Sequence, residues 1–337
     1  MKPALTVVMP VYNEALFIEN TLNQLLDQDC PSDFFEVIVA DGGSTDNTRE
    51  VVANIANSHP NIHLFDNPKK RSSSARNIGF MHGQGDYFLV IDGHCYIPSR
   101  TLLTDAVNFF REQKVHCLGR PQPLDPPDIS TFQQLVALAR SSSLGHGPGS
   151  LIFSDYEGEA SPVSNGAAYS REVFSKVGYV DEEFDACEDV EFNLRVEKAG
   201  LKAYTSPKLT VRYYPRESIK GLYCQMWRYG FGRLRLLKKH PDTLSAALLV
   251  PPSFVVLCCM AVVAFLALWA GMSGPLVWAP LGLMGLYFGL VTIESFRLSE
   301  KSWPDVPLLA VMIFFIHIGL GTGFLSGIWD FLRKQKV

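Results

Sequence analysis

Short, β-branched apolar runs alternate with longer amphipathic runs along the first part of the chain. The short runs predict strands, and the amphipathic runs, whose apolar residues recur at helical spacing, predict helices. The expected strands are 5–10, 37–41, 62–66 and 87–92, and the expected helices are 15–27, 47–57 and 72–82. This alternation is typical of βαβ units, which build a parallel sheet with helices on both faces. The pattern therefore predicts an α/β fold.

The region from 99 to 215 mixes helices with turns rich in glycine, serine and proline. Helices are expected at 99–113, 129–142 and 187–199, and a proline-rich turn is expected at 121–127. The loop 143–150 is rich in glycine and serine, and two interpretations of it stay open. It either becomes ordered around a ligand or is an ordinary surface connection.

The last third of the chain has the pattern of a membrane anchor. Residues 219–240 interleave aromatic and basic side chains, which predicts a helix lying in the lipid headgroup layer. Asp, Glu, Lys and Arg are absent from 243–293 and from 306–329, and the segments 248–270, 276–296 and 307–329 are each about long enough for one span. We expect an α/β domain over 1–215, an interfacial segment over 216–245 and a transmembrane region over 246–332.

Basic residues near the apolar segments predict their orientation. By the positive-inside rule, Arg233, Arg235, Lys238 and Lys239 keep the first domain cytoplasmic, with the loop 271–275 outside and the connection 297–305 inside. Three spans would then leave the basic tail around Gln335 outside, against the same rule. The alternative is a re-entrant hairpin broken at Gly319, Gly321 and Gly323. We favour three spans, because 307–329 is uncharged and about 23 residues long.

Composition excludes several classes of protein. Of the 337 residues, 47% are apolar and the formal charge is −4, which argues against disorder and against wholesale electrostatic binding to nucleic acid. The seven cysteines form no CxxC pair, and their odd number argues against a disulfide framework. The chain starts Met1-Lys2-Pro3 without the apolar stretch of a secretory signal. Neither a P-loop nor a GxGxxG follows the first strand, which disfavours nucleotide hydrolases and dehydrogenases.

Polar residues follow each predicted strand of the first half. They are Asn13-Glu14, Asp41-Gly42-Gly43, Asp66-Asn67 and Asp92-Gly93-His94. Ligands of open α/β sheets bind beyond the carboxyl ends of the strands, so these residues are candidates for a site. Asp41 could accept from a ribose or a base, or it could simply cap the next helix, and the two interpretations are about even. Glu14 has a similar alternative as the acidic start of the helix 15–27.

Three further positions could take part in chemistry. Arg76 lies near the start of a predicted helix, where the helix dipole disfavours a cation, so an anionic partner is expected. Asp92 and His94 could bind Mg²⁺ or Mn²⁺, although an Asp-Gly turn followed by a solvated histidine is more common. Glu188 and Asp189 open another helix, where acids are favoured, and one of them could instead be a general base.

Six segments occur together in an order that resembles the family 2 glycosyltransferases of the GT-A fold. They are VVMPVYNE, VIVADGGSTDNT, SSSARNIGF, YFLVIDGH, VSNGAAYSREVF and ACEDVEF. The resemblance covers about 1–215. The DGHCYIP form, the QMWRYGFGRLRLL segment and the C-terminal apolar segments are most similar to the succinoglycan-type bacterial exopolysaccharide glycosyltransferases. The resemblance implies a Rossmann-like mixed sheet that binds a nucleotide sugar.

The resemblance also implies roles for individual residues. Pro10, Tyr12, Glu14 and Asp41 would hold the nucleobase and ribose, and Arg76 the diphosphate. Asp92 and His94 correspond to the family's Asp-x-Asp, which binds ribose and metal, with histidine replacing the usual second carboxylate. Glu188 and Asp189 correspond to the family's Glu-Asp pair, whose Asp deprotonates the acceptor. Gln225, Arg228 and Tyr229 resemble the Gln-x-x-Arg-Trp motif of processive synthases, with Tyr replacing Trp, and Asn165, Gly166 and Ala167 would line the acceptor side.

The implied activity is inverting sugar transfer, dependent on Mn²⁺ or Mg²⁺, from a nucleoside-diphosphate sugar, with UDP-sugar favoured. The acceptor would be a lipid-linked saccharide or a growing polymer at the cytoplasmic face of the inner membrane. A processive polysaccharide synthase or a polyprenyl-phosphate glycosyltransferase is the alternative within this chemistry. A catalytically silent nucleotide-sugar-binding scaffold and a membrane-anchored nucleotide-binding regulator are the alternatives from other classes.

Overall fold

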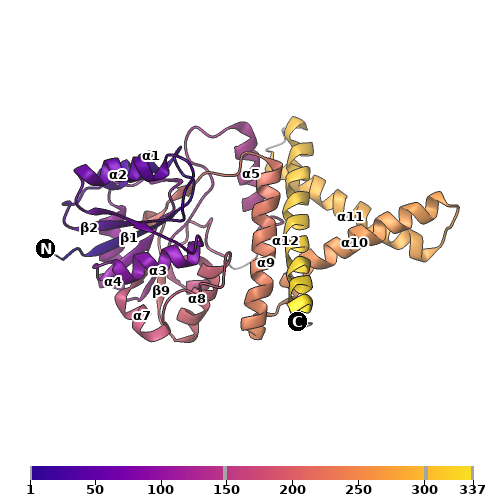
Figure 1. Ribbon diagram of the computed structural model, residues 1–337. Coiled ribbons are helices and arrows are strands. Elements are labelled where there is room, and N and C mark those ends of the chain that lie inside the picture. The colour runs from indigo at the N-terminus through magenta and orange to yellow at the C-terminus, as the bar shows by residue number, and fades with distance from the viewer. Residues whose placement is uncertain (1, 147–149, 300–302, 335–337) are drawn as a thin grey trace. The chain divides into compact units, whose positions relative to one another are not determined.

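A computed structural model describes residues 2–146, 150–299 and 303–334 (Figure 1). The chain forms two compact units, one of Met1–Ile129 with Gly149–Tyr214 and one of Ser130–Pro148 with Pro215–Val337. The expected boundary near residue 215 falls at the end of the first unit. Residues 130–148, which the sequence placed in the first domain, belong instead to the second unit. The reason is apolar packing, because Leu135, Val136 and Ala139 join the buried cluster of the C-terminal helices.

The first unit contains an eight-stranded mixed sheet with strand order β3-β2-β1-β4-β8-β6-β9-β7. The strands are β1 Leu5–Val11, β2 Phe35–Asp41, β3 Ile62–Asp66, β4 Tyr87–Val90, β6 Cys117–Gly119, β7 Gly158–Ala160, β8 Gly166–Ser170 and β9 Ala203–Thr205. The strands β3, β2, β1 and β4 are parallel, and β8 lies antiparallel to both β4 and β6. A separate two-stranded ribbon pairs β5, Cys95–Tyr96, with β10, Arg212–Tyr213. The expected α/β fold with a mixed sheet is confirmed.

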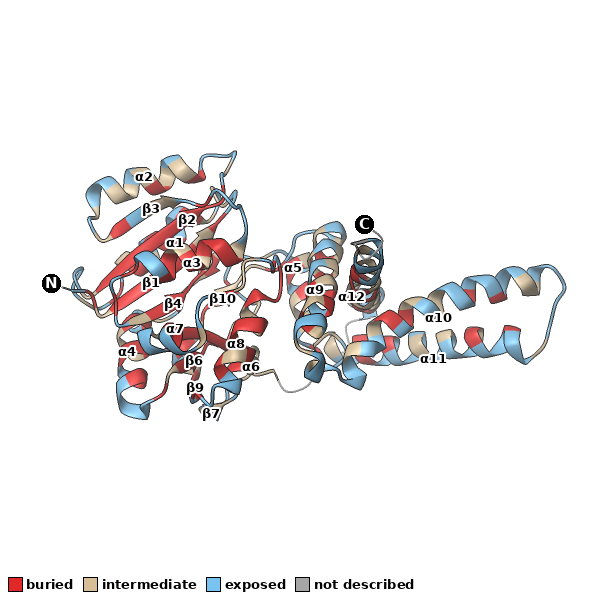
Figure 2. Cartoon of the chain, turned by 60° about the horizontal axis from the view of Figure 1, so that its bottom comes forward, coloured by how far each residue is buried: buried red, intermediate tan, exposed pale blue. Residues whose placement is uncertain are grey.

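Helices cover both faces of this sheet, because the apolar side chains of β1 point alternately to one face and to the other. Val7 and Met9 belong to one buried cluster, whereas Val8 between them belongs to another. The first cluster includes residues of α1 (Ile18–Leu26), α2 (Thr48–Ser58) and α4 (Leu102–Gln113), and the second those of α3 (Ser72–His82), α7 (Arg171–Val177) and α8 (Glu188–Lys198). Figure 2 shows the central strands buried between these layers. The short α6 (Pro162–Asn165) and η1 (Pro207–Leu209) complete the unit.

The second unit is helical. It contains α5 (Thr131–Ser141), α9 (Ile219–Lys239), η2 (Pro241–Thr243), α10 (Ala246–Trp269), α11 (Pro275–Leu298), η3 (Trp303–Asp305) and α12 (Val306–Lys334). The helices α10, α11 and α12 are long and apolar enough to cross a membrane. Every helix expected from the sequence in this region forms, within a few residues of its predicted ends. Parts of three expectations lie outside the described residues, namely 147–149 of the glycine-rich loop, Lys301 of the 297–305 connection and Gln335 of the tail.

Candidate active site

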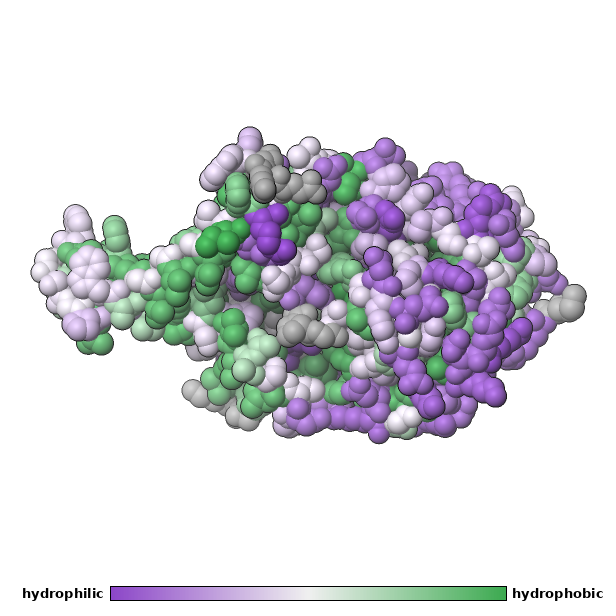
Figure 3. Space-filling model, turned by 180° about the vertical axis from the view of Figure 1, so that it is seen from behind, coloured by the Kyte–Doolittle hydropathy of each residue, from purple (hydrophilic) through white to green (hydrophobic). Residues whose placement is uncertain are grey.

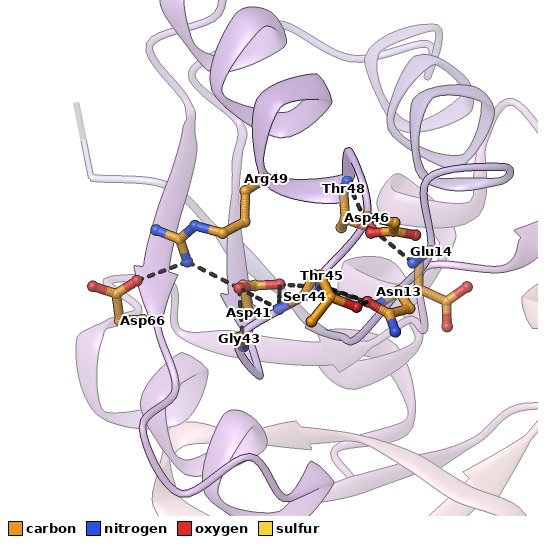
Figure 4. Close-up of polar contacts among 10 residues, drawn as sticks. All are labelled: Asn13, Glu14, Asp41, Gly43, Ser44, Thr45, Asp46, Thr48, Arg49 and Asp66. Carbon is orange, nitrogen blue, oxygen red and sulfur yellow. Dashed lines mark hydrogen bonds and ion pairs between the residues drawn. The ribbon is translucent and has the colours of Figure 1, made fainter.

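The loops that follow β1 and β2 are joined by hydrogen bonds (Figure 4). The backbone N–H of Asn13 donates to Ser44 Oγ (2.9 Å), and Asn13 Oδ1 accepts from the backbone N–H of Thr45 (2.8 Å). The backbone N–H of Glu14 donates to Thr48 Oγ1 (2.8 Å). Asn13 has a φ of 56°, a conformation that asparagine tolerates better than most residues. The candidate Asn13 and the side chains of Ser44 and Thr48, which the sequence analysis did not single out, therefore shape this rim.

Asp41 is nearly fully buried at the end of β2, and its carboxylate is already engaged. It accepts hydrogen bonds from the backbone N–H groups of Gly43 (3.0 Å) and Ser44 (3.2 Å), from the Ser44 hydroxyl, and from Arg49 Nη1 (2.9 Å). Burial alone would raise the pKa of Asp41, but the hydrogen bonds from Ser44 and Arg49 outweigh it and hold the pKa below its usual value. Arg49 also pairs with Asp66 (2.7 Å). In this conformation Asp41 shapes the turn, and its predicted contact with ribose or base requires an exchange of partners.

We expect Asp41→Asn to lower the free energy of unfolding by about 1.5–3 kcal/mol, the range for hydrogen bonds to charged groups. Because the folded-state pKa of Asp41 is lowered, the ionised carboxylate stabilises the fold above the unfolded pKa of about 3.9, and this contribution is lost as pH falls through the folded-state pKa. Chemical denaturation from neutral to acidic pH measures both effects, with the exposed Asp33→Asn as control. If the denaturant concentration at the unfolding midpoint were unchanged in Asp41→Asn, the proposed role of Asp41 in stabilising the turn after β2 would be wrong.

Tyr12 and Glu14 extend the rim beyond β1. The ring of Tyr12 is 54% exposed and lies beside Gly42, where an added Cβ would be 3.5 Å from the ring. An exposed aromatic face of this kind can stack on a nucleobase. The carboxylate of Glu14 lies 2.8 Å from Nδ1 of His94, so the loop after β1 contacts the loop after β4. Pro10 lies at the end of β1, paired with Ala40 of β2.

Arg76 of α3 pairs with an acid at the start of α8. Its Nη2 lies 3.5 Å from Glu188 Oε1, and both side chains are largely buried. Burial alone would lower the pKa of Arg76, but the carboxylates of Glu188, Asp189 and Asp92 raise it. The anionic partner expected for Arg76 from its place in the helix is thus a carboxylate of the protein itself. Arg76, Asp92, Glu188 and Asp189, which are far apart in sequence, form one electrostatic cluster.

The two acids of this cluster differ in their surroundings. Burial raises the pKa of Glu188, and Arg76 opposes the rise whereas Asp189 adds to it. Asp189 is only partly buried, and its Oδ1 accepts the backbone N–H of Val190 (2.9 Å). A general base must be reachable by the acceptor, and Asp189 is the more accessible of the two. The predicted role of Asp189 as the proton acceptor stays a prediction, with Asp189 the more exposed of the two acids.

The sequence analysis missed Arg120, which directly follows β6. Its side chain is 2% exposed, its Nη2 donates to the Tyr213 hydroxyl (2.8 Å), and its guanidinium lies 5.3 Å from the centre of the Tyr213 ring. Burial alone would lower its pKa, but the net shift is upward, with contributions from Tyr213 and Asp92. Among the described residues, none is hydrogen-bonded to its Nε or Nη1. The rule that selected Asp41 and Asp92, a polar residue after an apolar strand, did not reach Arg120 because the short strand β6 was not expected from the sequence.

The residues predicted for the acceptor side lie in both units. In the first unit, Asn165 is buried and donates through Nδ2 to Thr205 Oγ1 (2.9 Å), while a Cβ on Gly166 would approach the Pro162 carbonyl oxygen to 2.6 Å. Ala167 follows in β8. These contacts give Asn165 and Gly166 a packing role at the start of β8, and their predicted role toward an acceptor stays a prediction.

Gln225, Arg228 and Tyr229 lie on α9 of the second unit. Gln225 Oε1 accepts from Arg140 Nη1 of α5 (3.2 Å), and the Arg140 guanidinium lies 5.8 Å from the centre of the Tyr229 ring. Gln225 Nε2 and the Tyr229 hydroxyl are 3.4 Å apart. Arg140 was not expected from the sequence, because only the fold of the second unit brings α5 beside α9.

Asp92 and His94 offer a carboxylate oxygen and an imidazole nitrogen for a divalent cation. Among residues 2–146, 150–299 and 303–334, no group of three or more His, Cys, Asp or Glu side chains is arranged to hold a metal. Asp92 and His94 would hold the ion, and oxygens of the bound substrate would complete its coordination. Since Nδ1 of His94 lies against Glu14, a metal bound by His94 would use Nε2, with Glu14 orienting the ring. This donor set fits a divalent ion that bridges to a diphosphate.

Comparisons with known proteins agree with this geometry. A family model described as glycosyl transferase family 2 matches residues 6–178. Succinoglycan biosynthesis protein ExoA of Rhizobium meliloti is 30% identical over 334 residues, which cover 97% of this chain and 96% of ExoA. A Methanococcus voltae protein named dolichyl N-acetyl-alpha-D-glucosaminyl phosphate 3-beta-D-2,3-diacetamido-2,3-dideoxy-beta-D-glucuronosyltransferase is 24% identical, over 96% of this chain and 97% of that protein. These matches confirm the resemblance drawn from the motifs.

A solved structure has a similar fold. Mannosyltransferase PcManGT from Pyrobaculum calidifontis, in complex with GDP-Man and Mn²⁺, has a TM-score of 0.64 and 22% identity. The likeness covers 98% of this chain and 88% of that chain. Together with the eight-stranded mixed sheet, it confirms the expected fold class.

Proposed function

Because this chain belongs to glycosyl transferase family 2, and is therefore a glycosyltransferase in polysaccharide or glycoconjugate biosynthesis, we propose its substrates and its place in the cell. It transfers a sugar, with inversion, from a nucleoside-diphosphate sugar to a lipid-linked saccharide. The UDP-sugars are the favoured donors. The protein is anchored in the inner membrane by several passes, with the catalytic domain in the cytoplasm.

The observation that carries this proposal is the cluster around Arg76. Its guanidinium lies 3.5 Å from Glu188, and the charges of Asp92, from the donor side of the family pattern, and of Asp189, from the acceptor side, act on it as well. A transferase must hold donor and acceptor within reach of each other, and a shared cation between the two sets of carboxylates supports that arrangement.

In the proposed mechanism, Asp189 accepts the proton of the acceptor hydroxyl as that oxygen attacks the anomeric carbon. The nucleoside diphosphate leaves from the opposite face, so the configuration inverts. Arg76 stabilises the negative charge that develops on the diphosphate, and Glu188 orients Arg76. A divalent ion held by Asp92 and His94 would supply further charge neutralisation at the leaving group.

A screen of labelled nucleotide sugars against membrane lipid extracts tests the proposal. Transfer of label from a UDP-sugar to an organic-soluble product is the expected result, and Asp189→Asn is the matched control that should abolish it. Transfer from a GDP-sugar alone would overturn the donor assignment. The screen must include GDP-sugars because the structure of PcManGT contains GDP-Man. Label found only in a water-soluble product would overturn the lipid-linked acceptor.

We expect Mn²⁺ to support higher activity than Mg²⁺, because imidazole is a better ligand for Mn²⁺ and His94 replaces a carboxylate of the family pattern. Transfer by protein stripped with EDTA is measured while each ion is titrated. The His94→Asp variant is the control, and in this variant the activities with Mn²⁺ and with Mg²⁺ should be closer to each other. Full activity without a divalent ion would remove the metal from the proposal.

A processive synthase is the second candidate, favoured by one specific observation. Gln225 and Tyr229 are held together by Arg140, so the motif that resembles the processive synthases is an ordered polar surface. The product length on a defined acceptor distinguishes the candidates, since a single addition excludes processivity. A silent nucleotide-sugar-binding scaffold would not hydrolyse the donor in the absence of an acceptor, whereas either enzyme would. A nucleotide-binding regulator would bind the nucleotide with the same affinity whether or not a sugar is attached.

A further inference from the structure

The helix α12 is covered by α9 over much of its length. The Tyr223 hydroxyl lies 3.1 Å from Thr322 Oγ1, and Trp227 Nε1 donates to Ser326 Oγ (3.3 Å). Farther along, the Lys238 ammonium lies 3.9 Å from the centre of the Phe331 ring. Because both residue numbers increase together in these pairs, the two helices run parallel and side by side (Figure 1).

Glycines allow the two helices to touch through their backbones. A Cβ on Gly230 would lie 2.0 Å from the Leu320 carbonyl oxygen, and a Cβ on Gly323 would lie 2.0 Å from the Trp227 carbonyl oxygen. The N-terminal half of α12 also contributes to a buried cluster with α5, α9 and α11. Of the most apolar stretch of α12, 44% is buried within the protein, against 22% for α10 and 17% for α11. A helix that is buried from several sides is apolar all round, whether or not it meets lipid.

The helix α12 also lies across the α10–α11 hairpin rather than alongside it. The rings of Phe254 in α10 and Tyr287 in α11 are 4.3 Å apart, and both contact His317, whose Nδ1 lies 2.9 Å from the Tyr287 hydroxyl. A Cβ on Gly321, one turn later, would meet the Pro251 carbonyl oxygen of α10 at 2.3 Å. One short stretch of α12 therefore contacts both arms of the hairpin.

The views of the second unit agree with these contacts. In Figure 2, α12 is seen nearly end-on, whereas α10 and α11 extend across the page. The tip of the hairpin reaches well beyond α12, and Trp269 and Leu276 there are 86% and 91% exposed. Figure 3 shows apolar side chains along the surface of the protruding hairpin. Each arm has 24 residues, about 36 Å of helix, which is enough for a hydrocarbon core of about 30 Å.

The charges of α9 indicate how the helices of the second unit are oriented relative to a bilayer. Basic side chains occur along most of its 21 residues, at Lys220, Arg228, Arg233, Arg235, Lys238 and Lys239. If α12 crossed the membrane, α9 would be carried through the hydrocarbon beside it, and several of these charges would be placed in lipid at high cost. Lying along the membrane surface, α9 instead places them among the headgroups.

We propose that the chain crosses the bilayer twice, with α10 and α11, and that α12 lies with α9 along the cytoplasmic surface. The inference rests on the proposed membrane anchoring and replaces the three spans favoured from the sequence. It removes the conflict with the positive-inside rule, because Lys239, Arg297 and Arg333 then lie on the same side of the membrane. The partner of the hairpin is the bilayer core, and the partner of the α9–α12 pair is its inner headgroup layer.

Reporter fusions to the full chain in a Gram-negative bacterium test this topology. Green fluorescent protein fluoresces when it remains in the cytoplasm, and alkaline phosphatase becomes active only after export. After Val337 we expect fluorescence and phosphatase activity at background. Inserted after Ser273, in the loop between α10 and α11, the phosphatase should be active and the fluorescent protein dark, which makes this loop the matched control.

Active phosphatase after Val337 would overturn the proposal in favour of a third crossing. Fluorescence from the insertion after Ser273 would overturn it in favour of a hairpin that returns without crossing. A chain found in the soluble fraction would instead refute the membrane anchoring itself, so the two failures are distinguishable. Labelling of a single Cys introduced by Gln335→Cys in a cysteine-free variant, with an impermeant thiol reagent, repeats the test without a fusion, and we expect labelling only after permeabilisation.

Discussion

Asp189→Asn is expected to lower sugar transfer by about two to four orders of magnitude while donor binding stays nearly unchanged, because an amide cannot accept the acceptor proton. Asp189 is the more accessible carboxylate beside Arg76, and its substitution leaves the buried Glu188 in place. Initial rates on the identified acceptor and nucleotide-sugar affinity are measured separately. The loss should appear in kcat rather than in the affinity for the donor.

Glu183→Gln is the matched control for this prediction. Glu183 is an exposed acid a few residues upstream that the mechanism does not use, and its substitution should leave the rate near that of the wild type. A near-normal rate in Asp189→Asn on the true acceptor would show that another group is the base. If the rate fell together with donor affinity, Asp189 would belong to the donor site instead.

Arg76→Gln is expected to destabilise the first unit by about 3–5 kcal/mol, the cost of leaving a buried charge without its partner. The substitution keeps most of the side-chain volume but removes the cation that faces Glu188, Asp189 and Asp92. Thermal or denaturant unfolding of the purified protein measures the effect. The double variant Arg76→Gln, Glu188→Gln should recover part of the loss, because the buried carboxylate is then neutral as well.

An exposed ion pair provides the contrast. Arg100 Nε lies 3.0 Å from Asp29 Oδ1, with both side chains more than half exposed, so Arg100→Gln should cost no more than about 1 kcal/mol. Equal effects of Arg76→Gln and Arg100→Gln would contradict the assignment of Arg76 to a buried, electrostatically essential position. A double variant no more stable than Arg76→Gln alone would show that Glu188 is not the main partner.

Local patterns were enough to predict the four parallel strands and the longer helices of this chain, but not the short strands β5 to β10. The alternation in β1 places Val7 and Met9 on one face and Val8 on the other, and period and β-branching alone predict such a strand. The polar residues after the strands, Asp41 and Asp92 among them, were predictable as a shared rim because parallel strands end at the same edge. The family and its activity were also accessible from the sequence, because the motifs occur together in a fixed order.

Only the tertiary structure decided which groups neutralise one another and how the apolar helices pack against each other. The partners of Arg76 and the turn around Asp41 depend on distances between residues far apart in the chain, which no local pattern contains. Arg120 and Arg140 were overlooked because their importance comes from burial and from a neighbouring helix. Hydropathy identified α12 as apolar. It could not tell whether protein or lipid covers this helix, because both surroundings favour apolar residues. The contacts of α12 with α9 and with both arms of the hairpin show that protein covers part of this helix, which composition does not reveal.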